Sequence, residues 1–303
     1  MLFFALLILM QEPAAIKVDV RLVNAAFTVR DANGKLVNGL TKDDFEMLED
    51  GVRQEIKFFS LSSDLPLRLG LLLDGSGSQR SFNKAHRKDL EKFVESTLDT
   101  RDRALLLGFG NRLRVAADFT GSASAVMTGL THFEKQRFHG MEQLDRDEKR
   151  SGGTAVFDAV AAVSRQKLKQ FVGERKAIVL LSDGEDNASL HSLSDAIEAA
   201  QGADAPIYTV RYTEIRHGVA SRRNREGADA MNRLAEETGG TAFDATTGNV
   251  EKQLARIGEE LRNLYDIGYT SSNSGGEGQF RKITIRAKKA GLKVRAKDGY
   301  FAP

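Results

Sequence analysis

Six short apolar runs in the middle of the chain alternate with segments of helical periodicity, and this alternation constrains the fold most strongly. The runs occupy residues 67–74, 103–110, 113–120, 176–183, 205–212 and 240–245. Strands that are apolar on both faces must be covered on both sides, and the intervening helices can cover them. We therefore predict an α/β fold: a doubly wound, mostly parallel six-stranded sheet, in which the runs at 103–110 and 113–120 form one antiparallel hairpin at an edge.

Both ends of the chain instead show the period-two alternation of half-buried strands. Each end alone is near or below the size at which a core without metal or disulfide offsets chain entropy. We therefore predict that residues 16–62 and 263–303 combine into one discontinuous β-sandwich, with the α/β domain at 65–262 inserted between its two parts.

The first ten residues, MLFFALLILM, are all apolar. This run is too short to span a bilayer as a helix but matches the hydrophobic region of a secretory signal. A basic flank is missing, although the small residues Ala14 and Ala15 follow. We interpret residues 1–15 as a signal peptide, with a hydrophobic N-terminal strand or a wrongly assigned start codon as alternatives. A secreted, periplasmic or cell-envelope protein is expected, with membrane contact only through an uncleaved N-terminus.

Composition narrows the chemistry that the chain can perform. It contains no cysteine, which excludes disulfides, thiolate zinc sites and cysteine nucleophiles. Its 44 basic and 42 acidic residues give a net charge of +2, spread along the chain, so no strong field points to nucleic acid. The five histidines lack paired ligand spacing, and we expect them at solvated loop or helix positions. A metal ion would therefore need oxygen ligands.

Polar side chains follow the predicted strands at one edge of the sheet. Asp74, Ser76 and Ser78 come after LGLLL, Asp183 ends KAIVLLSD, and Thr154 precedes a helix that starts on the same side. Ligands of doubly wound sheets bind beyond the carboxyl ends of the strands. Carboxylates and hydroxyls suit Mg²⁺, with Mn²⁺ or Ca²⁺ as alternatives. For the first three residues alone, helix capping and a tight glycine turn is the competing interpretation.

These residues resemble the metal-ion-dependent adhesion site (MIDAS) of von Willebrand factor type A (VWA or VWFA) domains, with its pattern Asp-x-Ser-x-Ser, then Thr, then Asp. DGSGS, the GGT containing Thr154 and the SDGED containing Asp183 fill the pattern, and the similarity covers roughly residues 65–261. The resemblance implies a Rossmann-like fold, a divalent cation and a protein ligand that presents Asp or Glu. Both flanks are similar to those of the VWFA-related proteins of Acidobacteria, which are predicted to be exported.

Two polar loops, at 134–150 and 215–227, should project from the edge that carries these residues. Loops held beside a binding site on a rigid scaffold often select the partner. We therefore expect partner contacts from Gly153, Glu185, Arg216, Arg222 and Arg223, and an acidic protein fits the arginines. Simple solvation of both loops is the alternative.

The leading functional hypothesis is a non-catalytic, metal-dependent protein-binding module of the adhesion type, without a nucleic-acid partner or a small-molecule cofactor. A Mg²⁺-assisted hydrolase or phosphoryl-transfer enzyme is the first alternative. It would need a base or nucleophile beside the metal, and the sequence shows neither a Gly-x-Ser-x-Gly elbow nor a histidine placed there by motif. The second alternative is a structural or assembly component of an exported complex, in which the β-sandwich makes the contacts.

Overall fold

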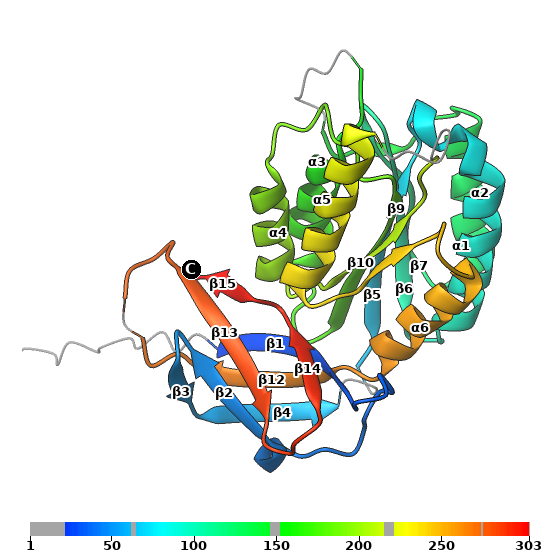
Figure 1. The fold of residues 1–303 in the computed structure, drawn as a ribbon. Helices are drawn as coiled ribbons and strands as arrows, with labels where there is room; N and C mark the ends of the chain where they lie inside the picture. The colour runs from blue at the N-terminus through cyan, green and yellow to red at the C-terminus, as the bar shows by residue number, and fades with distance from the viewer. Residues whose placement is uncertain (1–21, 62–64, 146–151, 215–220, 274, 303) are drawn as a thin grey trace, which may run out of the picture.

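The computed structural model describes residues 22–61, 65–145, 152–214, 221–273 and 275–302. The predicted signal peptide and Arg216 lie outside the described residues. Figure 1 shows an α/β unit above and a β unit below, with the chain passing from the β unit into the α/β unit and back. None of the helices in the described ranges has the length and apolar character needed to cross a membrane.

A seven-stranded sheet of order β11-β10-β9-β5-β6-β7-β8 forms the centre of the α/β unit. Its strands are β5 (Leu67–Asp74), β6 (Arg103–Phe109), β7 (Leu113–Thr120), β8 (Glu142–Gln143), β9 (Arg175–Ser182), β10 (Ile207–Arg211) and β11 (Ala242–Asp244). The mostly parallel sheet and the antiparallel β6–β7 hairpin confirm the predicted fold class. The seventh strand, β8, pairs antiparallel with β7. It was not predicted, because two polar residues carry no periodic signal.

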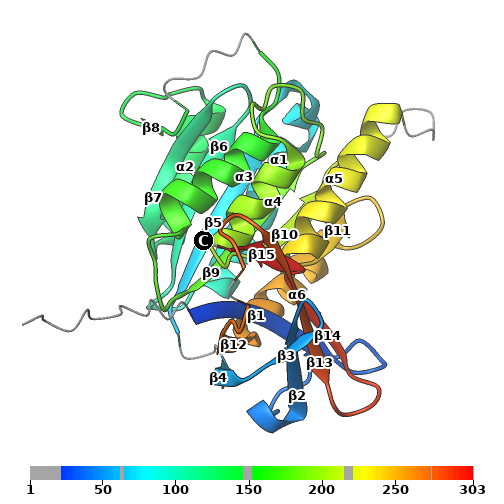
Figure 2. The same cartoon turned by 90° about the vertical axis from the view of Figure 1, so that its left-hand side faces the viewer.

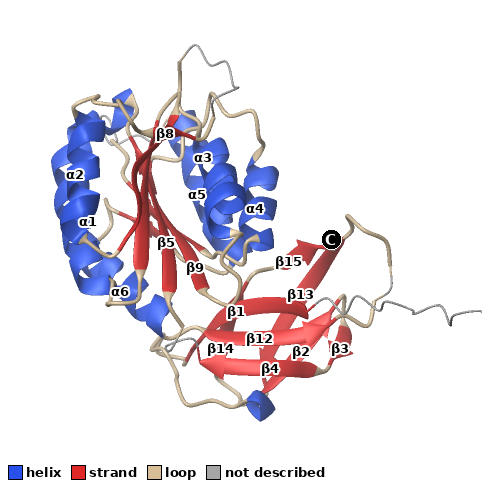
Figure 3. Ribbon diagram, turned by 180° about the vertical axis from the view of Figure 1, so that it is seen from behind, coloured by secondary structure: helices blue, strands red, loops and turns tan. Residues whose placement is uncertain are grey.

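Helices cover both faces of this sheet, as its apolar strands require (Figure 3). One face packs against α1 (Asn83–Thr97), α2 (Ala123–Glu134) and α6 (Val250–Arg262). The other face packs against α3 (Val156–Ala162) with its π-helical continuation Val163–Leu168, α4 (Leu193–Gly202) and α5 (Arg222–Thr238). Two separate apolar cores result, one on each side of the sheet.

The two flanks of the chain form two further four-stranded sheets, of order β14-β1-β12-β4 and β15-β13-β2-β3. The first flank supplies β1 (Leu22–Arg30), the 3₁₀ helix Lys42–Asp44, β2 (Phe45–Glu49), β3 (Val52–Gln54) and β4 (Ile56–Leu61). The second supplies β12 (Tyr265–Thr270), β13 (Phe280–Ala287), β14 (Lys293–Ala296) and β15 (Gly299–Phe301). β1 pairs with β12 and β2 pairs with β13, so both sheets need both flanks (Figure 2).

The core between these two sheets is aromatic. Phe27 of β1 stacks on Tyr265 of β12 with ring centroids 5.4 Å apart, and Phe45 of β2 meets Phe27 edge-on at 5.0 Å. All three side chains are buried. Burial of rings contributed by both flanks explains why segments more than 200 residues apart fold as a single sandwich.

Candidate metal-binding site

Asp74 is the last residue of β5, and its carboxylate lies inside the protein, 1% exposed. The hydroxyl of Ser182 donates a hydrogen bond to its Oδ2 at 2.6 Å, and the backbone N–H of Ser76 donates to its Oδ1 at 2.9 Å. These two bonds fix the orientation of the carboxylate at the carboxyl end of the central strand.

Ser76 and Ser78 follow in the segment that leads into α1. Their hydroxyl oxygens are 3.0 Å apart, and Ser76 is the residue that precedes the 3₁₀ helix Gly77–Phe82. Ser76 is half-buried and Ser78 is exposed. Two hydroxyls therefore stand together at the open side of the same strand end.

Asp183 directly follows β9, the parallel neighbour of β5, and it is 3% exposed. Gln79 donates its side-chain N–H to Oδ2 of Asp183 at 2.8 Å, and the backbone N–H of Glu185 donates to Oδ1 at 3.0 Å. Burial raises the pKa of Asp74 to about 6, and the negative charge of Asp183 adds to this effect. The two carboxylates are therefore close enough to repel each other.

Thr154 lies just before α3, and backbone hydrogen bonds join this segment to the residues that follow β9 and β6. Its N–H donates to Oδ1 of Asn187 at 2.7 Å, and its carbonyl oxygen accepts from the N–H groups of Asn187 and Ala188, each at 3.1 Å. The next residue, Ala155, donates its N–H to the carbonyl oxygen of Gly110, just after β6, at 2.9 Å. Thr154, which is 7% exposed, thus belongs to the same edge of the sheet as Asp74 and Asp183.

The chemistry of this set of side chains fits a hard divalent cation. It offers two carboxylates and three hydroxyls and no sulfur or imidazole. Neither Asp74 nor Asp183 forms a salt bridge within the described residues, although both are buried, so their charges lack a compensating cation from the protein. Nowhere in the described ranges do three or more His, Cys, Asp or Glu side chains gather around a common metal position. A metal site at this edge would therefore also need the hydroxyl groups of Ser76, Ser78 and Thr154 as ligands.

The side chains predicted to contact a partner are distributed around this edge. Gly153 is exposed and has a φ of +89°, where an added Cβ would lie 2.3 Å from Oδ1 of Asn187. Burial and the charge of Asp183 raise the pKa of the half-buried Glu185. Arg222 and Arg223 are exposed in the first turn of α5, where Arg222 forms an ion pair with Glu226 at 2.7 Å.

Three residues of this edge were missed by the sequence interpretation. Ser182, Gln79 and Asn187 hold Asp74, Asp183 and Thr154 in place through the bonds described above. Ser182 is the first residue of the motif SDGED and Asn187 directly follows the motif, so their proximity to Asp183 was visible in the sequence. Gln79 carried no such signal, because only the turn of the 3₁₀ helix directs it across to β9.

The histidine at position 86 was expected at a solvated position, and this expectation was wrong. His86 is 1% exposed, and its ring packs edge-on against that of Tyr212 with centroids 4.3 Å apart. It belongs to the inward stripe of α1 together with Leu90 and Phe93, so helical periodicity places it in the core.

A family model described as the von Willebrand factor type A domain matches residues 69–257. The match covers more than half of the chain, and the chain belongs to this family. It is a VWA domain protein and contains a module of the adhesion type; domains of the family commonly bind proteins and often bind divalent cations.

Solved structures with a similar fold come from several bacteria. An aerotolerance-related membrane protein from Bacteroides fragilis is 17% identical, with a TM-score of 0.47 over 64% of this chain and 98% of its own. BatB from Bacteroides thetaiotaomicron is 17% identical, with a TM-score of 0.46 over 65% and 97%. A von Willebrand factor type A protein from Catenulispora acidiphila is 13% identical, with a TM-score of 0.45 over 94% and 75%. No curated protein sequence matches the chain significantly.

Proposed function

We propose that this chain is a metal-dependent protein-binding module whose ion is held by Asp74, Ser76, Ser78, Thr154 and Asp183. The observation that carries the proposal is the pair of buried carboxylates at neighbouring strand ends, Asp74 and Asp183, without a salt bridge to any described cation. A buried charge without a partner is costly, and a bound dication removes that cost.

The charge balance supports a carboxylate as the incoming group. Two aspartates neutralise one dication, while serine and threonine hydroxyls add ligands without charge. Mg²⁺ bound there supplies a coordination position for an oxygen of an Asp or Glu side chain from another protein. Arg222 and Arg223, exposed in the first turn of α5, add positive charge beside the site and favour an acidic partner surface.

The immediate surroundings of the two carboxylates support a binding role over a catalytic one. The side chains that donate hydrogen bonds to them among the described residues are Ser182 and Gln79, neither of which is a general base. Glu185, a further carboxylate that is influenced by the charge of Asp183, accepts a hydrogen bond from the side chain of Asn224 at 3.1 Å. We propose that the module has no enzymatic activity.

The setting that we propose is the cell envelope or the exterior of the cell. The apolar start of the chain supports export, and the paired flanking sheets support assignment to the exported VWFA-related group of Acidobacteria. In that setting disulfide formation is possible, and the absence of cysteine means that the fold does not depend on it.

The test combines metal binding with partner capture. Mg²⁺ titration by calorimetry should show one site, and a partner captured from the native source in Mg²⁺ should be lost in EDTA. Thr154→Ala and Asp74→Ala should each weaken Mg²⁺ binding and partner binding by at least about tenfold, since each substitution removes a metal ligand. Thr128→Ala is the matched control, because Thr128 is exposed on α2 and bonds only to its own helix.

Three outcomes would contradict the proposal. The first is undiminished partner binding by the Thr154→Ala protein, and the second is partner binding that persists in EDTA. The third is Mg²⁺-dependent turnover of phosphoester or ester substrates by the purified protein, which would favour the enzyme alternative.

A further inference from the structure

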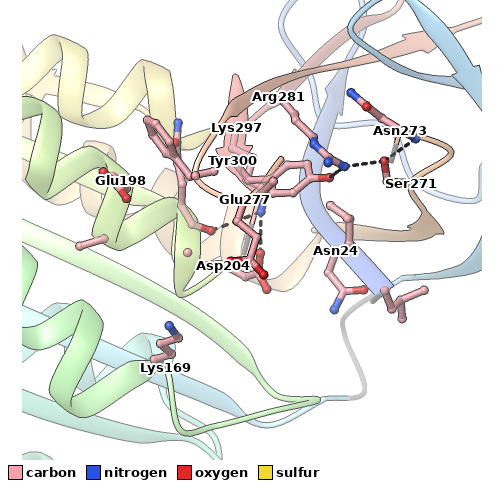
Figure 4. Close-up of a pocket in the computed structure, with 18 of the residues that line it drawn as sticks. Asn24, Lys169, Glu198, Asp204, Ser271, Asn273, Glu277, Arg281, Lys297 and Tyr300 are labelled. Atoms are coloured by element: carbon pink, nitrogen blue, oxygen red, sulfur yellow. Dashed lines mark hydrogen bonds and ion pairs between the residues drawn. The ribbon is translucent and has the colours of Figure 1, made fainter. Parts of the chain in front are cut away.

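A pocket of about 750 Å³ lies between the α/β unit and the β-sandwich (Figure 4). One wall comes from α4 and the end of the π-helical segment, with Lys169, Glu198 and Asp204. The opposite wall comes from the start of β1, the connection between β12 and β13, and β15 with the residues around it. The volume suits a small ligand or a short peptide. We call this cavity the junction pocket.

The walls of the junction pocket are held rigidly. Lys297, which is 6% exposed, forms an ion pair with Asp204 at 2.6 Å and so ties the two walls together. On the sandwich side, Arg281 donates hydrogen bonds to the hydroxyl of Ser271 and to the carbonyl oxygen of Gly275, both at 2.8 Å. Figure 4 shows the contacts of Lys297 with Asp204 and of Arg281 with Ser271. A ligand would therefore meet a preorganised surface.

Within the part of the chain that the structure describes, the start of β1 presents an unpaired strand edge to this pocket. β1 pairs with β12 over Leu22–Phe27, but with β14 only over Phe27–Arg30. The carbonyl oxygen of Val29 and the N–H of Asp31 bond to residues 35–37 on the side away from β14. Because backbone groups alternate in direction along a strand, those of Leu22 and Asn24 point to the side where β14 has already ended.

A second unpaired edge faces the same pocket. Among the described strands, β15 pairs only with β13, and the N–H of Ala302 bonds to the carbonyl oxygen of Gln279 at 2.9 Å. The same alternation turns the N–H and C=O of Phe301, one residue earlier, away from β13. Phe301 lines the junction pocket, as do Leu22 and Asn24.

Large apolar side chains lie at these edges, and charged side chains lie across the pocket. Leu22 is 49% and Phe301 is 39% exposed, which is high for large apolar residues. Across the pocket, Lys169 and Glu198 form no ion pair with any residue in the ranges that the structure describes. The pocket thus offers apolar contacts at the strand edges and, on the helical wall, the charges of Lys169 and Glu198 beside Arg165 and the ion-paired Asp204.

We propose that the junction pocket binds an extended peptide segment of another protein, which adds as a strand to the free edge of β1. A peptide backbone supplies donors and acceptors in alternation at strand spacing, and this is what an unpaired strand edge lacks. Apolar side chains on one face of the peptide pack on Leu22 and Phe301, and charged ones on the other face meet Glu198 and Lys169. The site is independent of the metal site at the opposite end of the sheet.

The test uses the full chain and the acetylated hexapeptide Lys-Val-Thr-Val-Glu-Val, with amide hydrogen exchange as the measurement. At saturation the peptide should slow exchange of the Leu22 and Asn24 amides at least tenfold. The same peptide with every amide N-methylated should have no effect, since neither of its edges can donate hydrogen bonds to the strand. Asn24→Pro should abolish the effect, because it removes an outward N–H, whereas Asn24→Ala should retain it. Proline is tolerated at an unpaired edge position.

Three results would overturn this inference. Protection of β4, the other edge of the same sheet, in place of β1 would place the peptide elsewhere. Slow exchange at Asn24 in the protein alone would show that the edge is already paired. Equal effects of the natural and the N-methylated peptide would show that binding does not use hydrogen bonds from the peptide backbone. This comparison remains valid even if the Asn24→Pro protein fails to fold.

Discussion

The side-chain amide of Gln79 donates hydrogen bonds to Oδ2 of Asp183 at 2.8 Å and to the carbonyl oxygen of Tyr212 at 3.1 Å. Gln79 follows β5, Asp183 follows β9 and Tyr212 follows β10, so one buried side chain joins the ends of three parallel strands. Gln79 is therefore a positioning residue for Asp183.

Gln79→Leu should lower the free energy of unfolding by about 1–3 kcal/mol, because it leaves Oδ2 of the buried Asp183 carboxylate without its side-chain donor. It should also weaken Mg²⁺ binding, since Asp183 is no longer held in place. Chemical denaturation with and without Mg²⁺ measures both effects. Arg80→Leu, at the next and exposed position, is the control. A Gln79→Leu protein as stable as the wild type, with unchanged Mg²⁺ affinity, would refute the role.

His86 should make the protein less stable in mild acid. Burial lowers its pKa from 6.5 to about 4, and neither ring nitrogen has a hydrogen-bond partner among the described residues. Between these two values the unfolded chain takes up a proton that the folded chain does not, so stability falls as the pH falls. The full loss amounts to about 3 kcal/mol.

The contribution of His86 can be isolated by substitution. His86→Leu removes the titrating group, so the difference in unfolding free energy between this variant and the wild type should change between pH 7 and pH 4. His132→Leu, at an exposed position of α2, should show no such change. A constant difference for His86→Leu across that range would mean that the ring is accessible to protons.

Much of this architecture could be predicted from the sequence because it depends on periodicity. The apolar runs predicted the parallel strands, and the period-two alternation at both ends of the chain predicted the sandwich. Both patterns follow from which side chains are buried. The short β8 could not be predicted, because it forms through its pairing with β7 and has no periodic pattern of its own. The residues Asp74, Asp183 and Thr154 could be placed at one edge from topology. The residues that form hydrogen bonds to them, above all Gln79, could not be predicted. Their contacts depend on side-chain directions, which a sequence pattern does not encode.

Close packing at Gly184 positions the loop that carries Asp183 against α5. Its φ is +79°, and an added Cβ would lie 2.3 Å from the carbonyl oxygen of Gly227 in α5. Gly184→Ala should destabilise the protein by about 2 kcal/mol or more, from backbone strain and the clash together. It should also displace α5 from the loop that carries Asp183, and so weaken Mg²⁺ binding.

Gly77→Ala is the matched control for this substitution. Gly77 lies between Ser76 and Ser78, yet nothing lies within 4 Å of its added Cβ. Thermal unfolding should show little change for Gly77→Ala and a clear decrease in Tm for Gly184→Ala. Equal behaviour of the two variants would mean that α5 does not pack on this loop in solution.

Proton competition at Asp74 provides the last prediction. Its pKa is raised from 3.8 to about 6, chiefly by burial and in part by Asp183. In the absence of metal, the folded state keeps a proton between these values that the unfolded state has lost. Stability therefore decreases as the pH rises through this window, by about 3 kcal/mol in total, which is opposite in sign to the effect of His86.

Bound Mg²⁺ should reverse that dependence, because it requires the ionised carboxylate that burial disfavours. The affinity for Mg²⁺ should fall by about tenfold per pH unit below the pKa of Asp74, and calorimetric titrations from pH 5 to pH 8 measure this fall. Asp74→Asn, which cannot ionise, should lose both the pH dependence and most of the affinity. An affinity that stays constant over the whole range would show that no proton leaves Asp74 when the ion binds, and Asp74 would then not be a ligand.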